Sequence, residues 1–185
     1  MISTMKKPMK KDRAQTEFTE EIALAFFARH LDGLKWKYHR YPEKPVLYSG
    51  FNGDNVQWDF SLYARETSPG HFLLGVNSFV PNKTPLARRA AIMELLTRIN
   101  FDLSVGCFEL DLADGEIRFR TSIILTGADI TPGIIEHLLR SNLSIVDERF
   151  PQITAVLYSD VTPVNALNLK RQISGVTPEP RFELN

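Results

Sequence analysis

The hydrophobic pattern of residues 45–77 is the feature that most constrains the fold of this chain. Apolar side chains recur there at every second position, first in Val56, Trp58, Phe60 and Leu62 and then in Phe72, Leu74 and Val76. A period of two is typical of half-buried antiparallel strands. Asn52-Gly53 and Ser68-Pro69-Gly70 supply residues that suit tight turns. The segment therefore predicts a meander of three antiparallel strands.

A helical period of 3.6 residues precedes the meander. The first helix is expected between Thr16, which would cap its free N–H groups, and Gly33. Its apolar residues fall on two faces, and one of these faces consists of Leu24, Phe27 and Leu31. Such a helix needs apolar cover on both sides.

Threonine-proline pairs predict the starts of three further helices, because threonine caps free amides and proline fits the first helical position. These pairs begin at Thr84, Thr131 and Thr162. The second helix has a wide apolar arc that contains Leu86, Ala90, Ile92, Met93, Leu96 and Ile99. The third is expected to continue through Pro151, since its apolar arc keeps the same phase on both sides of that proline.

A second hairpin is expected in residues 108–121, with Asp114-Gly115 at its turn. If these are the two loop residues, Asp111 lies opposite Arg118 and Glu109 lies opposite Arg120, so that opposite charges pair on the solvated face. The elements together predict an α+β fold. A single antiparallel β-sheet packs against helices in the order α-β-β-β-α-β-β-α.

The 185 residues fit a single domain with one core. We expect this single α+β domain to span residues 14–172. Residues 1–13 predict a flexible basic arm, because they lack apolar periodicity and contain Lys6, Lys7, Lys10, Lys11 and Arg13. Residues 173–185 predict an irregular C-terminal tail.

Charge and cysteine content narrow the possible partners and location. Lysine and arginine total 22, as do aspartate and glutamate, so the chain lacks the positive field of a general nucleic-acid binder. No apolar run approaches the roughly 20 residues of a membrane span. Cys107 is the single cysteine and is expected to be a buried structural thiol. We therefore expect a cytoplasmic protein that does not bind nucleic acid and has no membrane span.

The sequence predicts no catalytic, cofactor-binding or metal-binding residues. His30, His39, His71, His137 and Cys107 show no short metal-ligand spacing. The glycines of the meander fall at hairpin turns instead of between a strand and a helix, where a phosphate loop would need them. A nucleophile without a local motif stays open, because catalytic partners meet only in space.

Four residues are candidates for contact with a protein partner: Trp36, Tyr38, Asn142 and Arg149. The first two belong to a mixed aromatic and basic cluster. The other two interrupt the apolar arc of the long helix, where they either reach solvent or an internal carbonyl or line a groove that a peptide fills. The second apolar face of the first helix and the wide arc after Pro85 also predict a homodimer.

The element order, the stretches 45–48 (Pro-Val-Leu-Tyr) and 72–76 (Phe-Leu-Leu-Gly-Val), and Tyr158 resemble the YbjN family of bacterial sensory transduction regulators. The resemblance covers residues 16–172. This family is in turn similar to type III secretion chaperones of the Tir class, which are small cytoplasmic dimers that hold partner proteins. The resemblance implies the fold of these chaperones and a regulatory or chaperone-like role. It identifies no catalytic residue in this chain.

The function predicted from these observations is a non-enzymatic regulator or chaperone-like protein that acts through protein-protein interaction. A first alternative is a sensor that responds to a small molecule, which should enclose an apolar pocket with a few convergent polar groups. A second is a hydrolytic enzyme without a recognisable motif. A partner-binding protein should instead expose a contiguous apolar patch.

Overall fold

The computed structural model describes residues 18–41 and 43–169 of the chain. Its centre is a six-stranded antiparallel sheet with the strand order β1-β2-β3-β4-β6-β5. The strands are β1 (His39–Arg40), β2 (Val46–Asn52), β3 (Gln57–Ser68), β4 (His71–Phe79), β5 (Cys107–Leu110) and β6 (Ile117–Thr126). The helices are α1 (Glu20–Gly33), α2 (Arg89–Asp102), α3 (Pro132–Tyr158) and α4 (Pro163–Leu167). The predicted α+β class and element order are confirmed, with β1 as an additional short edge strand.

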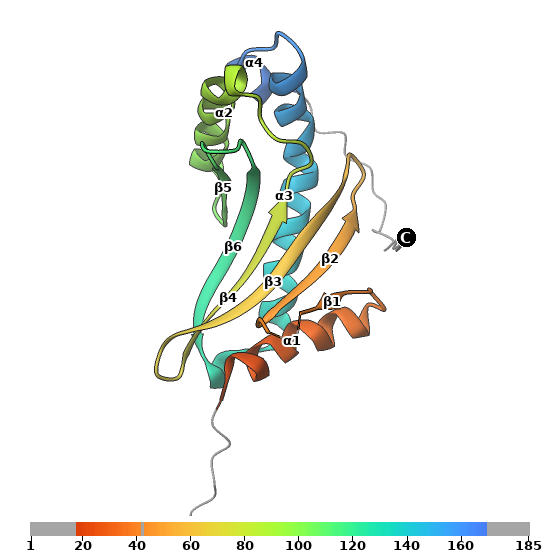
Figure 1. Ribbon diagram of the computed structural model, residues 1–185, viewed down its shortest axis with the longest axis vertical. Coiled ribbons are helices and arrows are strands. Elements are labelled where there is room, and N and C mark those ends of the chain that lie inside the picture. Colours follow the sequence, from red (N-terminus) through yellow and green to blue (C-terminus); the bar gives the residue numbers. More distant parts are fainter. Residues whose placement is uncertain (1–17, 42, 170–185) are drawn as a thin grey trace, which may run out of the picture.

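The helices pack against one face of the sheet. The period of two sends Trp58, Phe60, Leu62 and Ala64 of β3 into the core, and β4 and β6 continue this buried layer. Figure 1 shows α3 running along the length of the sheet, with α1 crossing one end and α2 and α4 at the other. The opposite face of the sheet has no helix on it among the described residues.

The first helix begins later than the sequence pattern indicated. Its N-cap is Thr19, whose hydroxyl accepts a hydrogen bond from the backbone N–H of Ile22, whereas the predicted cap Thr16 lies outside the described residues. The face formed by Leu24, Phe27 and Leu31 is buried in the core of the same chain. That face therefore cannot support dimerisation, which corrects one of the two reasons for expecting a dimer.

The long helix α3 continues through Pro151, as its hydrophobic phase predicted. Proline has no N–H, so the carbonyl of Asp147 loses the hydrogen bond it would normally accept within the helix. The side chain of Asn55, in the β2–β3 turn, donates to this carbonyl at 3.1 Å. The Asp147 carboxylate also accepts from the backbone N–H groups of Asp54 and Asn55. The interruption in α3 is thus the point where the β2–β3 turn docks.

The β5–β6 hairpin forms, but its predicted register is wrong. Glu109 lies opposite Arg118, and not opposite Arg120. The loop is longer than two residues, because Asp111 still pairs with Glu116 through the backbone and Gly115 donates to the carbonyl of Asp111 at 2.8 Å. Glu109 nevertheless forms ion pairs with both Arg118 and Arg120 on the outer face.

The start of α2 also differs from the prediction. Residues Leu86–Arg88 form a 3₁₀ turn, α2 itself begins at Arg89, and no side chain caps it. The hydroxyl of Thr84 is buried without a hydrogen-bond partner, while its backbone N–H donates to the carbonyl of Gly115 at 2.7 Å. Thr84 therefore anchors the β5–β6 turn instead of capping a helix.

Candidate interaction surface

Helix α2 has one buried face and one exposed apolar face. Ile92, Leu95, Leu96 and Ile99 are buried against the core. The opposite side exposes Ala90, Met93, Thr97 and Phe101, and Leu86 of the preceding 3₁₀ turn continues their line. We call these five residues the α2 stripe. Phe101 is 91% exposed, Leu86 78% and Met93 48%. A spacing of three and four residues places these side chains on one line along the helix.

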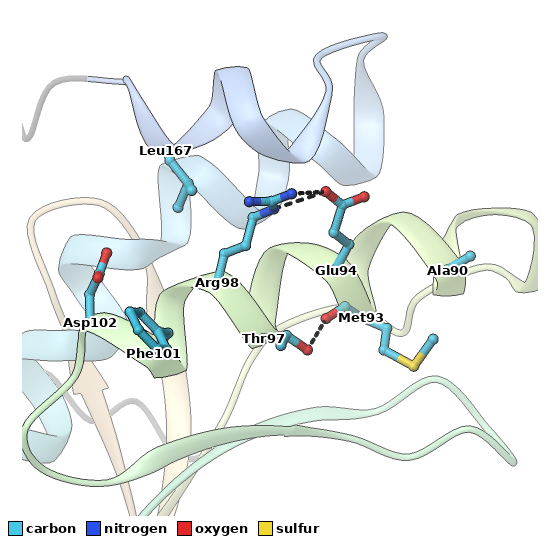
Figure 2. A pocket seen from close by; sticks show the side chains of 8 residues that line it. All are labelled: Ala90, Met93, Glu94, Thr97, Arg98, Phe101, Asp102 and Leu167. Carbon is cyan, nitrogen blue, oxygen red and sulfur yellow. Dashed lines mark hydrogen bonds and ion pairs between the residues drawn. The ribbon is translucent and has the colours of Figure 1, made fainter.

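A groove of about 710 Å³ runs beside this stripe, between α2 and α4 (Figure 2). Leu167 of α4 points towards α2 from the far wall, and Phe101 and Asp102 lie at one end. Glu94 and Arg98 form an ion pair at 2.8 Å on the side of α2 that faces α4. The groove is therefore mainly apolar, with the ion pair on its flank and the carboxylate of Asp102 at one end.

Exposing this much apolar surface has a free-energy cost that a bound partner would remove. Burial of apolar surface contributes roughly 25 cal/mol per Å², and aromatic residues dominate the energy of protein interfaces. A single exposed leucine is ordinary, whereas an aligned set with a nearly fully exposed phenylalanine is typical of an interaction site. The arrangement suits binding of an apolar protein surface.

Trp36 and Tyr38 follow α1 and cover one end of the core. The Trp36 ring lies 5.6 Å from the ring of Phe51 and 6.4 Å from that of Phe60. Burial raises the pKa of the Tyr38 hydroxyl, and the carboxylate of Asp32 raises it further. Both side chains keep some exposure, so their contact with a partner stays a prediction.

Asn142 lies inside the protein and not on its surface. Its side-chain N–H groups donate to the carbonyls of Val76 and Phe119 and to the hydroxyl of Thr121, all within 3.2 Å. Its side-chain oxygen accepts from Ser78 at 2.5 Å. Of the two roles considered for Asn142, the structure shows bonding to internal groups. A fully buried and satisfied amide has nothing to offer a partner, so we do not include it in the interaction surface.

Arg149 lies in the C-terminal half of α3. Its guanidinium approaches Glu148 at 3.4 Å and donates to the side-chain oxygen of Gln152 at 3.3 Å. Gln152 in turn donates to the carbonyl of Leu167, the residue that lines the α2–α4 groove. Arg149 is therefore linked to the rear of the groove, and its contact with a partner stays a prediction.

Comparison with known proteins identifies the family. The family model named YbjN, described as "Putative bacterial sensory transduction regulator", matches residues 25–155. This chain belongs to the YbjN family. No curated protein matches the sequence.

Two solved structures are similar to this YbjN-family chain. A chain from the "Crystal Structure of the ExsC-ExsE Complex" is 13% identical, with a TM-score of 0.48, over 71% of this chain and 92% of that one. The "Crystal structure of YbjN, a putative transcription regulator from E. coli" is 14% identical, with a TM-score of 0.46, over 72% of this chain and 87% of that one.

A charged cluster on the outer face of β5 and β6 was only partly foreseen in this YbjN-family chain. Burial opposes ionisation of Glu109, but the hydrogen bonds and charges of Arg118 and Arg120 hold its pKa below the usual range. Burial likewise opposes the charge on Arg120, but Glu109 and Cys107 raise the pKa of its guanidinium. The charge pattern of the two strands signalled this cluster, although the predicted register assigned the pairs wrongly.

The described residues also bear on the chemistry considered from the sequence. They contain no group of three or more histidine, cysteine or carboxylate side chains placed to hold a metal ion. None of the helices in that part of the chain is long and apolar enough to cross a membrane. Two further grooves, of about 500 and 630 Å³, lie beside Leu34 and beside Tyr41 and Tyr48, all of which have exposed side chains. Nothing in the part of the chain that the structure describes therefore favours the sensor alternative.

Proposed function

We propose that this YbjN-family protein is a non-enzymatic, cytoplasmic regulator or chaperone-like protein that acts through protein-protein interaction as a homodimer. The observation that carries the proposal is the α2 stripe, with Phe101 exposed over 91% of its surface. The family description supports a regulatory role. The equal numbers of acidic and basic residues favour a protein partner over nucleic acid.

A second copy of the same helix fits the α2 stripe. If two α2 helices pack antiparallel about a two-fold axis near Leu96, Glu94 of one copy faces Arg98 of the other, twice. The same arrangement brings Met93 of one copy close to Phe101 of the other. Oppositely charged flanks beside an apolar line are typical of helix pairs that specify their own partner and orientation.

The dimer is tested by light scattering after gel filtration. The wild-type chain should have the mass of two copies at micromolar concentration. The double variant Met93→Glu/Phe101→Glu should have the mass of one copy, because it places carboxylates opposite each other in a buried interface. Its circular dichroism spectrum should match that of the wild type, since both residues are exposed in the single chain.

Leu34→Glu is the matched control. Leu34 is also an exposed apolar residue, but it lies at the C-terminal end of α1, at the other end of the sheet from α2. This variant should remain dimeric. A wild-type chain with the mass of a single copy, or a dimer that survives the double substitution, would contradict the proposed interface.

A further inference from the structure

Strand β6 has a neighbour along only part of its outer edge. Strand β4 pairs with it as far as Thr126, whereas β5 pairs with it only from Ile117 to Arg120. Figure 1 shows the short β5 beside one end of the long β6. Residues 122–126 therefore form a sheet edge that has no adjacent strand within residues 18–41 and 43–169. We call it the free β6 edge.

Hydrogen bonds at both ends of β6 show which of its residues face β4. The carbonyl of Ile117 accepts from the N–H of Val80, just after β4, at 2.9 Å. The N–H of Gly127 donates to the carbonyl of Gly70, just before β4, at 3.3 Å. The pairing between them has a constant register without a bulge. Since backbone groups alternate in direction along a strand, the odd-numbered residues of β6 bond to β4.

The even-numbered residues consequently point their backbone groups away from β4. The carbonyl of Glu116 confirms this, because it accepts from Asp111 on the β5 side. Beyond Arg120 the N–H and C=O groups of Ser122 and Ile124 and the N–H of Thr126 are directed to the free edge, while the carbonyl of Thr126 starts the 3₁₀ turn Gly127–Asp129. Such a row of backbone donors and acceptors matches another extended backbone.

The side chains of this edge lack the usual protection against strand addition. Residues 121–126 read Thr-Ser-Ile-Ile-Leu-Thr, with no charge and no proline. Ile123 is 36% exposed and Ile124 57% exposed. At the opposite edge of the sheet, β1 has only two residues, and Arg40 forms an ion pair with Glu21. Strand β2 extends beyond β1, but its residues 49–52 are buried or half-buried, whereas residues 122–124 of β6 are exposed. Short strands and charge protect sheet edges in natural proteins, so the two edges differ in their capacity to accept a strand.

We propose that the free β6 edge binds an extended segment of the protein partner as an added strand. The segment needs an unbroken run of N–H groups, hence no proline, and uncharged β-branched or aliphatic side chains beside Ile123 and Ile124. This inference rests on the proposed function and states the class of partner that it would recognise.

A partner segment fits this edge better than a second copy of the chain. The α2 stripe already supplies a surface for a two-fold interface, which closes after two copies. A second two-fold interface at β6 would join dimers either into open chains or, if its axis crossed the first at right angles, into a closed tetramer. We assign the β6 edge to a different polypeptide, because the backbone groups of so few residues suit one added segment better than an interface between two folded copies.

The probe is a fluorescent peptide of six alternating threonine and valine residues with a lysine at each end, measured by fluorescence anisotropy. A second peptide carries proline at a central position. The protein variant Ile124→Pro removes an outward N–H without removing a hydrogen bond to β4, and Ile124→Val is its matched control. The first peptide should bind the wild type and Ile124→Val. Either proline change should weaken binding at least about tenfold.

Hydrogen exchange of the Ser122 and Ile124 amides gives a second readout on the unaltered protein. Both amides should exchange rapidly in the free protein and slowly with the first peptide bound. Slow exchange in the free protein would overturn the proposal, because the edge would then be covered by the chain itself or by a second copy. Equal binding of the two peptides, or no binding at about 1 mM peptide, would also overturn it.

The two proposals fail separately. Met93→Glu/Phe101→Glu should lose the dimer and keep peptide binding, while Ile124→Pro should keep the dimer and lose peptide binding. If the wild type is a dimer and Ile124→Pro has the mass of one copy, the edge binds a second copy of the chain. The proposed partner segment would then be rejected.

Discussion

The turns at Gly70 and Gly115 use the same backbone conformation in very different surroundings. Their φ angles are 75° and 85°, a region that side-chain-bearing residues adopt only with strain. A Cβ atom added at Gly70 would have no other atom within 4 Å, whereas one added at Gly115 would lie 2.2 Å from the carbonyl oxygen of Thr84. The turn at Gly70 thus has open space where a side chain would lie, whereas the turn at Gly115 is docked against the loop before α2.

The chemistry of a turn and its contribution to stability are therefore separate properties. Both turns have a glycine at the position that needs positive φ, and this glycine can be recognised in the sequence. The docking of the β5–β6 turn depends on Thr84, which is distant in sequence, and on a backbone approach that leaves no room for a side chain. The expected effects of substitution therefore differ between positions that look alike.

The largest effect is expected for Gly115→Ala. The alanine would have to adopt positive φ, at about 1–2 kcal/mol, and its Cβ would displace the backbone of Thr84, at a further 1–3 kcal/mol or so. We expect a loss of about 3 kcal/mol in the free energy of unfolding, measured by urea denaturation. Gly70→Ala is the matched control and should lose only about 1 kcal/mol. Equal losses would show that the docking of the Gly115 turn contributes nothing.

An intermediate effect is expected for Asp147→Ala, which releases the other docked turn. The backbone N–H groups of Asp54 and Asn55 would lose the carboxylate that accepts from them. The expected loss is about 1–3 kcal/mol of unfolding free energy, the range for removing a charged hydrogen-bond acceptor. Asp160→Ala, which removes an exposed ion pair with Arg88, should change stability by less than about 1 kcal/mol. An equally small loss for Asp147→Ala would show that the contact of the β2–β3 turn with α3 contributes little to stability.

The smallest effect is expected from titration of Glu109, which joins the two strands of the docked hairpin. Its pKa is lowered in the folded protein, so its contribution to stability is present above the unfolded value of 4.5 and is lost as pH falls through the folded value. Glu109→Gln should therefore reduce the pH dependence of the unfolding free energy below about pH 4.5. An unchanged pH dependence would show that its pairs with Arg118 and Arg120 do not stabilise the hairpin.

The β5–β6 hairpin shows where prediction from the sequence stops. The alternation and the Asp114-Gly115 pair located the strands and the turn, but a register based on a two-residue loop was wrong. In the structure Asp111 accepts from the N–H of Ala113, and Asp114 accepts from the N–H of Glu116, which stabilise a longer loop. The contact with Thr84 adds to this. The register thus depends on side-chain bonds and a tertiary contact that a charge pattern does not reveal.

The candidate interaction surface shows a similar division. The wide apolar arc of α2 was visible in the sequence, but the pattern gives no distinction between Met93, which is exposed, and Leu96, which is buried. The placement of α3, β5 and α4 decides which part of the arc is covered. Phe101 was outside the predicted arc, although its spacing of four residues from Thr97 and eight from Met93 would have placed it on the same face of the helix.

The order of strands and helices, the continuation of α3 through Pro151 and the turn positions follow from local sequence patterns, because they depend on periods and backbone preferences that neighbouring residues set. Four further features depend on the packing of distant segments: Leu24, Phe27 and Leu31 face the core, Asn142 bonds internally, the α2 stripe stays exposed and β6 extends beyond β5. These outcomes depend on which segments distant in sequence meet, and a one-dimensional pattern records which residues need cover without recording what covers them.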